Sequence, residues 1–522
     1  MRIGALTVPG IRELATSTIL ATALSSGACV TEANNSPSLR GARSSRDGDD
    51  PVDSGVTTDG SSKPPPKPVP GLHAEYFDGY RDKLVERIEP NLDHDWKADP
   101  PAAGIGKDRF SVRWTGTLTP IVTGATTITI DADDGTRVWI DGKLVIDDWH
   151  AHFTERHSAD VELTKDQPVS LRVDYFEADL DASARLSWAA GAKLPKQIIP
   201  GDRFMTTNQP SGLAGPKPPF ANPVMPFDCP DPGVLGVGDE FYAACTGGSL
   251  PIRSSRDLVT WNDVANSAIL PSGKPAWAAN GNRNWAPELH RADKTFLAYY
   301  TSVNGSDVLS VGVASAPSPT GPWTDNGAPL VEHPQGVIDA TFFEDDDGSR
   351  WLFYKIDGNA SGNPTPIFAR RLASDGLSFA PGSTATQVLT NASSTWEGAV
   401  IEAPWVVKRD ARYYLFYSGN VYDQHYRTGV ARATSVTGPW EKKGSPILGN
   451  NATWVGPGHG SVVRVNELDY FVYHAWHNAG DGTTGGGGRQ VLVDRITWSD
   501  GWPSIANGSP SSGAQPWPGE PF

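Results

Sequence analysis

Short segments that alternate apolar with polar residues run through the chain from about residue 71 to residue 205. Residues 127–131, 137–141 and 171–175 alternate with a period of two, which is typical of half-buried β-strands. Asp134-Gly135 and Asp141-Gly142 follow two of these segments and favour tight hairpin turns. We therefore predict one β-sandwich or β-barrel domain over residues 71–205.

A second β pattern repeats between residues 216 and 522. Short aromatic strands recur there, and the aromatic residue that marks each one is followed by the next after 55, 55, 62 and 57 residues. The marker residues are Phe241, Phe296, Trp351, Tyr413 and Tyr470. Five β units of nearly constant period, with no helical segment between them, predict a five-bladed propeller. The expected fold class is therefore all-β throughout.

Composition narrows the range of ligands. The 522 residues include 55 Gly, 44 Pro and 18 Trp, a mixture that favours short strands joined by turns over helical bundles. The formal net charge of -16 excludes nucleic acid as a partner, because phosphate binding needs a basic surface. Many tryptophans on an acidic chain favour neutral ligands held by stacking, and sugars are the usual case.

The first 70 residues carry the features of an exported protein. Residues 1–29 have the charge and apolar run of a signal peptide, and Cys29 follows Gly27-Ala28 as a lipidated cysteine would. Residues 30–70 are rich in Ser, Asp, Gly and Pro and predict a disordered linker. We expect a secreted or cell-surface lipoprotein of a bacterium, attached to a membrane only through Cys29. Cys229 and Cys245 are expected either to pair in an oxidising compartment or to be buried free thiols.

Polar residues stand in register about ten positions before each aromatic strand of the second domain. They are Asp231, Glu288, Asp339, Glu402 and His459, spaced 57, 51, 63 and 57 residues apart. The first strand of a propeller blade faces the central channel, so equivalent positions of the five blades converge. Four carboxylates gathered there are costly for stability, because like charges repel. Clustered carboxylates are what glycosidic cleavage needs, one protonated and one ionised.

At these positions the second domain resembles glycoside hydrolase family 43. The resemblance lies in residues 231–234, 285–288, 337–339, 401–404 and 456–459, and in Arg489 with residues 498–503. It implies an inverting mechanism in which Asp231 is the general base, Glu402 the general acid and Asp339 the residue that raises the pKa of the acid and orients it. Inversion implies a separation of roughly 6.5–9.5 Å between base and acid.

Other residues of the second domain are candidates for weaker roles. Glu397 competes with Glu402 as the acid, but Glu402 keeps the spacing to the next aromatic strand. We predict that Trp285, Glu288, Trp396, His459 and Arg489 contact the substrate. The resemblance also implies that His459 approaches a central Ca²⁺ through water; the alternative is a hydrogen-bonded core histidine.

The first domain resembles the protective-antigen-type domain in residues 71–77, 110–116 and 133–142. The resemblance implies that Asp133 and Asp134 hold Ca²⁺, which in turn binds sugar hydroxyls, and calcium prefers such oxygen ligands. The alternative is that the pair only caps a hairpin turn. A third ligand matches no motif, although Asp179 and Asp181 stand in a suitable loop.

Together these features predict a monomeric, exported inverting glycosidase that acts on arabinose- or xylose-containing plant polysaccharide. Arabinose release, by an α-L-arabinofuranosidase or arabinanase, is the preferred activity. A β-xylosidase or galactan-cleaving enzyme is the alternative, and a non-catalytic surface carbohydrate-binding protein is the alternative from another class. No cofactor is required for the chemistry, and Ca²⁺ is expected only in a structural role.

Overall fold

The computed structural model of the protein describes residues 66–213 and 215–519. The predicted signal peptide, Cys29 and residues 30–65 of the predicted linker lie outside these residues. Val69 and Pro70, assigned to the linker from composition, form the first strand and pair with Thr206 and Met205. Within the described residues, no helix is long and apolar enough to cross a membrane.

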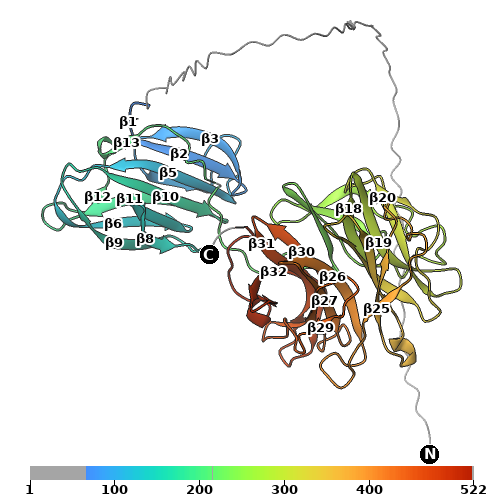
Figure 1. The fold of residues 1–522 in the computed structure, drawn as a ribbon. Coiled ribbons are helices and arrows are strands. Elements are labelled where there is room, and N and C mark those ends of the chain that lie inside the picture. Colours follow the sequence, from blue (N-terminus) through green and yellow to red (C-terminus); the bar gives the residue numbers. More distant parts are fainter. Residues whose placement is uncertain (1–65, 214, 520–522) are drawn as a thin grey trace, which may run out of the picture. The chain divides into compact units, whose positions relative to one another are not determined.

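The first domain consists of two antiparallel sheets around one core, drawn in blue to green in Figure 1. The eight-stranded sheet has the order β1-β13-β5-β10-β7-β8, with β2 between β3 and β5. Its strands are β1 (Val69–Pro70), β2 (Leu72–Asp78), β3 (Asp82–Glu89), β5 (Phe110–Leu118), β7 (Thr136–Ile140), β8 (Lys143–Asp148), β10 (Val169–Glu177) and β13 (Phe204–Thr206).

The second sheet of this domain has the order β12-β11-β6-β9, with β4 beside β11. Its strands are β4 (Asp93–Lys97), β6 (Gly124–Asp133), β9 (Glu155–Leu163), β11 (Ala182–Ala189) and β12 (Gln197–Ile198), and a 3₁₀ turn, η1 (Gly201–Arg203), precedes β13. Alternate residues of both sheets, such as Trp114 on β5 and Ile130 on β6, are fully buried in the shared core. The apolar half of each alternating pattern therefore forms the core, as the period of two predicts.

The second domain contains five sheets of four antiparallel strands each, and the prediction of a five-bladed propeller is confirmed. The blades are β14 (Gly233–Val237), β15 (Glu240–Ala244), β16 (Pro251–Ser255) and β17 (Asn262–Ala268); β18 (Trp285–Ala292), β19 (Thr295–Val303), β20 (Leu309–Ala316) and β21 (Thr324–Asp325); β22 (Val337–Glu344), β23 (Arg350–Ile356), β24 (Ile367–Arg371) and β25 (Thr386–Leu389); β26 (Ile401–Arg409), β27 (Arg412–Gly419), β28 (Arg427–Ala433) and β29 (Glu441–Lys442); and β30 (Trp454–Val465), β31 (Leu468–Asn478), β32 (Thr484–Ser499) and β33 (Trp502–Ile505). Two 3₁₀ turns, η2 (Asn359–Ser361) and η3 (Ala506–Gly508), lie in the connections.

The first strand of each blade contacts the first strands of its two neighbours, and β14 contacts β30, so the ring is closed. The five predicted aromatic markers lie on β15, β19, β23, β27 and β31, the second strand of each blade. Figure 1 shows this succession in colours from green to red. The aromatic side chains pack between sheets, which is why they recur with the blades.

The segment that leads into the first blade closes the ring by pairing with the last one. Val224 N–H donates to Val491 O at 2.8 Å, and Cys229 N–H donates to Arg489 O at 2.9 Å. This segment also carries a disulfide: Cys229 and Cys245 are bonded, with Cα atoms 5.2 Å apart and 16 residues of separation. Of the two alternatives for these cysteines, the structure shows the pair. The disulfide ties the chain just before Asp231 to the end of β15.

We expect the double substitution Cys229→Ser/Cys245→Ser to lower the free energy of unfolding of the propeller by about 2–4 kcal/mol, because the crosslink restricts the unfolded chain. Urea unfolding followed by tryptophan fluorescence measures the change. Reductant should shift the wild-type midpoint to that of the variant and leave the variant unchanged. Equal midpoints for the oxidised wild type and the variant would contradict the prediction.

Candidate active site

The five registered polar residues stand just before the first strand of their blade or in its first half. Strands β18, β22, β26 and β30 each show a register shift against the next strand at this level. Asp231, Asp339 and His459 have positive φ values of 55°, 55° and 45°, and Ala286 and Ala403 have 43° and 54°. Bulges with a left-handed residue re-aim a side chain out of the strand alternation. The same local irregularity thus recurs in the blades at the level of the site.

Four of these residues line one cavity of about 310 Å³. The cavity is bounded by carboxylates, by two basic side chains and by aromatic and amide groups, and residues of all five blades and their connections contribute to its lining. Its lining residues are Asp231, Thr246, Trp285, Ile338, Asp339, Lys355, Asp357, Asn359, Val400, Glu402, Asn420, Val421, Tyr422, His459 and Arg489. The three predicted catalytic carboxylates therefore face a common space.

Asp231 is buried, and both of its carboxylate oxygens accept hydrogen bonds from side chains. Arg489 Nη1 donates to its Oδ1 at 3.0 Å, and Thr246 Oγ1 donates to its Oδ2 at 2.6 Å. His459 Nδ1 and His474 Nδ1 each lie 3.3 Å from Oδ1. Burial acts to raise the pKa of Asp231, but the charge of Arg489, with the nearby His459 and His474, outweighs it and holds that pKa well below its usual range. Asp231 is therefore ionised, as a general base must be.

Glu402 lies between a lysine and a tyrosine. Lys355 Nζ is 2.8 Å from its Oε2, and Tyr426 OH donates to its Oε1 at 2.8 Å. Lys355 is itself almost fully buried and also contacts Asp357 at 2.8 Å. Burial acts to raise the pKa of Glu402, but the charge of Lys355 outweighs it and lowers that pKa.

The pKa of Asp339 is shifted in the opposite direction, upwards. Burial, with a contribution from the charge of Glu402, raises the pKa of Asp339 to about 7, and its Oδ2 accepts a hydrogen bond from Ala403 N–H at 3.0 Å. Asp339 and Glu402 therefore titrate as a pair that holds one proton up to about neutral pH. The role predicted for Asp339, raising the pKa of Glu402 and orienting it, stays a prediction. The structure adds Lys355, which the sequence reading did not include.

Two further glutamates are buried near the site without lining it. Burial and the charges of Asp339 and Asp231 raise the pKa of Glu288 well above its usual range, and its Oε2 has no hydrogen-bond partner. Glu397 is bound by Lys442 Nζ and Tyr417 OH, both at 2.7 Å. Because Glu397 is held by structural donors away from the cavity, the geometry favours Glu402 as the acid.

The other predicted substrate contacts divide into two groups. Trp285, His459 and Arg489 line the cavity, whereas Glu288 and Trp396 do not. The Trp396 ring stacks on Tyr417 with a centroid distance of 5.8 Å, so it is a packing aromatic in this structure. The role of His459 towards Ca²⁺ stays a prediction.

Four residues that bind Asp231 or Glu402 were missed by sequence reasoning. Three of them, Thr246, Tyr426 and Lys355, come from second strands or loops and bind a carboxylate oxygen directly. Lys355 follows Phe353-Tyr354 on β23, and a charged residue in an otherwise buried aromatic strand is the signal that could have revealed it. His474 was also missed; burial lowers its pKa to about 4, so its neutral ring accepts Asp231 N–H at 3.1 Å.

In the first domain, Asp133 and Asp134 lie beside Glu177 rather than Asp179 or Asp181. Carboxylate oxygens of the three buried residues lie within 4.8 Å of one another. Both oxygens of Asp134 accept backbone N–H groups, from His152 at 2.7 Å and Ala178 at 2.8 Å. Burial and the charge of Asp134 raise the pKa of Glu177 to about 9, and its Oε1 is buried without a partner. Three carboxylates with an unsatisfied oxygen fit a hard divalent cation.

A five-bladed propeller whose cavity is lined by three buried carboxylates matches the expectation of a glycoside hydrolase. The sequence profile of glycosyl hydrolases family 43 matches residues 220–503, more than half of the chain. The protein belongs to this family, and residues 68–200 match the PA14 domain, which is the protective-antigen-type domain.

The chain is also similar to individual proteins. The extracellular exo-alpha-(1->5)-L-arabinofuranosidase ArbA of Cellvibrio japonicus is 27% identical over 317 residues, covering 53% of this chain and 86% of the relative. Anti-sigma-I factor RsgI3 of Acetivibrio thermocellus is 36% identical over 143 residues, and the match spans 27% of this chain and only 22% of that protein. A crystal structure of a thermostable family-43 glycoside hydrolase superposes with a TM-score of 0.52 at 28% identity, covering 57% of this chain and 99% of that one.

Lys355→Met should move the alkaline limb of the pH profile of kcat/KM to higher pH. Lys355 lowers the pKa of Glu402, so removal of its charge raises that pKa and lets the acid keep its proton at higher pH. Initial rates across pH 4–9 (about five units around the pKa of the pair) measure the shift. A limb that stays in place, or moves to lower pH, would show that Lys355 does not set the protonation of the acid.

Proposed function

We propose that the protein is an exported inverting glycosidase that releases arabinose from plant polysaccharide. The observation that carries the proposal is the pairing of an ionised Asp231 with a proton-holding pair, Asp339 and Glu402, around one cavity. One carboxylate ready to accept a proton and another group ready to give one are the two requirements of glycoside hydrolysis.

The proposed reaction is a single displacement. Asp231 takes a proton from a water molecule as the water oxygen bonds to the anomeric carbon. Glu402 gives its proton to the leaving glycosidic oxygen as the bond between that oxygen and the anomeric carbon breaks. The products are a sugar of inverted configuration and an alcohol, and the proton on Asp231 later returns to Glu402 through solvent. Binding of substrate moves the proton shared by the pair from Asp339 to Glu402, against the effect of Lys355, which lowers the pKa of Glu402.

Arg489 and Trp285 suit the binding of the sugar. Arg489 Nη1 is bound to Asp231, and the guanidinium also lies 5.1 Å from the Tyr422 ring, so its position is fixed from two sides. Trp285 offers an aromatic face at the cavity wall, where sugar rings pack. A cavity of about 310 Å³ is at the small end of ligand sites, which favours a short sugar subsite.

The choice of arabinose rests on the Cellvibrio japonicus relative and its printed activity. A β-xylosidase or a galactan-cleaving enzyme would use the same carboxylates with different loops around the cavity. The disulfide suits an oxidising compartment and thus supports export, and attachment through Cys29 completes the proposal.

The test is product analysis by NMR with debranched arabinan, arabinoxylan, xylan and β-galactan in parallel. Arabinose released with inverted anomeric configuration supports the proposal, and xylose or galactose would move the assignment to the alternative substrate. Retained configuration would overturn the mechanism. No release from any polymer, with the folded protein still retained on one, would favour a non-catalytic carbohydrate-binding protein.

Glu402→Gln should lower kcat by about 10²–10⁴-fold because it removes the proton donor, while oligosaccharide binding is retained. Initial rates and calorimetric titration measure the two effects. Glu397→Gln is the matched control: it should reduce thermal stability and leave kcat within a few-fold of wild type. If Glu397→Gln were inactive and Glu402→Gln active, the assignment of the acid would be reversed.

For the first domain we propose a Ca²⁺-dependent sugar site formed by Asp133, Asp134 and Glu177. The unpartnered Glu177 Oε1 and the proximity of three carboxylates support a bound cation. Such a cation would neutralise the acidic cluster and present open coordination positions to vicinal hydroxyls.

Asp133→Asn should weaken retention of the full chain on immobilised polysaccharide in the presence of Ca²⁺, and leave the hydrolysis of a small soluble arabinoside unchanged. Affinity electrophoresis with Ca²⁺ or with chelator measures retention. Retention that is equal for wild type and variant, with or without Ca²⁺, would leave Asp133 and Asp134 as residues of a hairpin turn only.

A further inference from the structure

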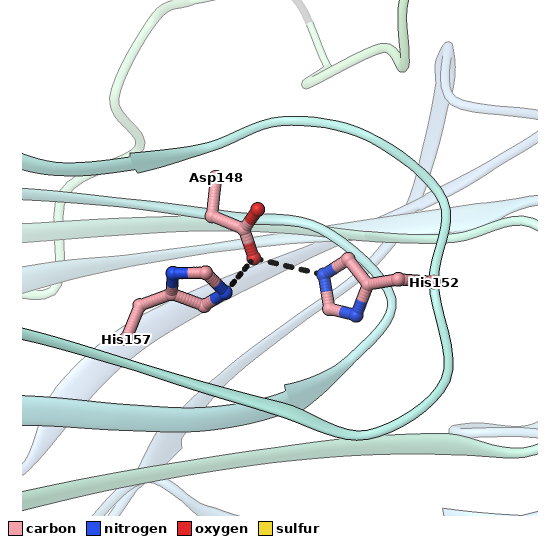
Figure 2. Close-up of side chains that lie close together, drawn as sticks. All are labelled: Asp148, His152 and His157. Atoms are coloured by element: carbon pink, nitrogen blue, oxygen red, sulfur yellow. Dashed lines mark ion pairs between the residues drawn. The ribbon is translucent and has the colours of Figure 1, made fainter.

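A second group of ligand-type side chains lies at the sheet edges of the first domain. Asp148 is the last residue of β8, at the edge of the eight-stranded sheet, and His157 is on β9, at the edge of the five-stranded sheet. His152 belongs to the connection 149–154 between these two strands. Figure 2 shows that both imidazole rings point to the carboxylate of Asp148.

Both rings approach the same carboxylate oxygen. His152 Nε2 and His157 Nε2 each lie 2.8 Å from Asp148 Oδ2. The side chains of Asp148 and His152 are 2% and 5% exposed, and that of His157 is 33% exposed. None of these three atoms has a hydrogen bond of acceptable geometry, although all are buried. Buried polar atoms normally have partners, so the convergence requires a reason.

The tautomer of His152 follows from the contact of its other ring nitrogen. Its Nδ1 lies 2.5 Å from the backbone oxygen of Phe153, which can only accept a hydrogen bond, so Nδ1 carries a proton. Nε2 is then the ring nitrogen that can offer a lone pair to a cation beside Asp148 Oδ2. Histidine ligands of metals commonly donate their other ring N–H to a backbone carbonyl, as His152 does.

We propose that Asp148, His152 and His157 form a binding site for a transition metal of the Zn²⁺ type. Two imidazoles and one carboxylate suit Zn²⁺ and its neighbours in the first transition row, rather than Ca²⁺ or Mg²⁺. Ligand bonds of about 2.1 Å in a tetrahedron separate the ligand atoms by about 3.4 Å, so the rings need to move outward by about half an ångström.

Neighbouring groups complete the site. Glu155 Oε2 lies 3.3 Å from His157 Nε2 and is the nearest candidate for a fourth ligand. His150 Nδ1 lies 3.0 Å from Asp148 Oδ1, the oxygen that faces away from the two rings, and orients the carboxylate. Because the ligands come from an edge strand of each sheet, the bound metal links the two sheets at this edge and fixes the connection 149–154.

The test uses the full chain without a histidine tag, freed of metal by a chelator. Calorimetric titration with Zn²⁺ should show one strong site per chain, and Co²⁺ should give visible absorption bands of a tetrahedral complex. His152→Ala and His157→Ala should each weaken Zn²⁺ binding at least tenfold. His425→Ala is the matched control, because His425 is an exposed histidine of the propeller paired with Asp423, and it should bind as wild type does.

Thermal unfolding separates a site from adventitious binding. Zn²⁺ should raise the melting temperature of wild type and His425→Ala, and leave that of the two site variants unchanged. If an alanine variant does not fold, the same measurements are made on His157→Gln, a milder change at a partly exposed position. Failure of wild type to bind Zn²⁺, or equal Zn²⁺ affinity in wild type and site variants, would overturn the proposal and leave a hydrogen-bonded Asp–His cluster.

Discussion

The catalytic domain depends on the compensation of charge at the centre of the ring. Asp231, Glu288, Asp339 and Glu402 are buried close enough to shift one another's pKa, which would be strongly destabilising without partners. Two cationic side chains compensate these charges: Arg489 is paired with Asp231, and Lys355 with Glu402. Burial raises the pKa of the remaining carboxyls, Asp339 and Glu288, which favours their neutral form. The charge balance that keeps the ring stable thus also sets the protonation of the candidate site.

Much of the site could be predicted because the blade repeat places equivalent residues at one level. The aromatic second strands fixed the number of blades, and the register of Asp231, Asp339 and Glu402 followed from their spacing. The repeat did not distinguish residues that face the cavity from those buried beside it. A register shift lies between Trp285 and Glu288, and it separates a cavity-lining tryptophan from a buried carboxylate. Strand alternation alone cannot show such a shift.

Residues that act across blades were harder to predict. Lys355 reaches Glu402 from β23 of the preceding blade, and Tyr426 reaches it from the connection between β27 and β28 of the same blade, so neither contact follows from the spacing of the repeat. In the first domain, the motif identified Asp133 and Asp134, whereas Glu177 comes from a strand of the other sheet. The connection 149–154 is shared by both acidic sites there: His152 N–H binds Asp134, and its ring faces Asp148. Local sequence carries little information about such distant pairs.

The closure of the ring has a consequence for the electrostatics of the candidate site. The segment that ends at Asp231 pairs with the strand that carries Arg489, so Asp231 and its compensating cation come from the first and the last blade. Separation of these two blades, even with all five sheets intact, would remove the positive charge that lowers the pKa of Asp231. The joint that completes the ring therefore also maintains the charge balance of the cavity.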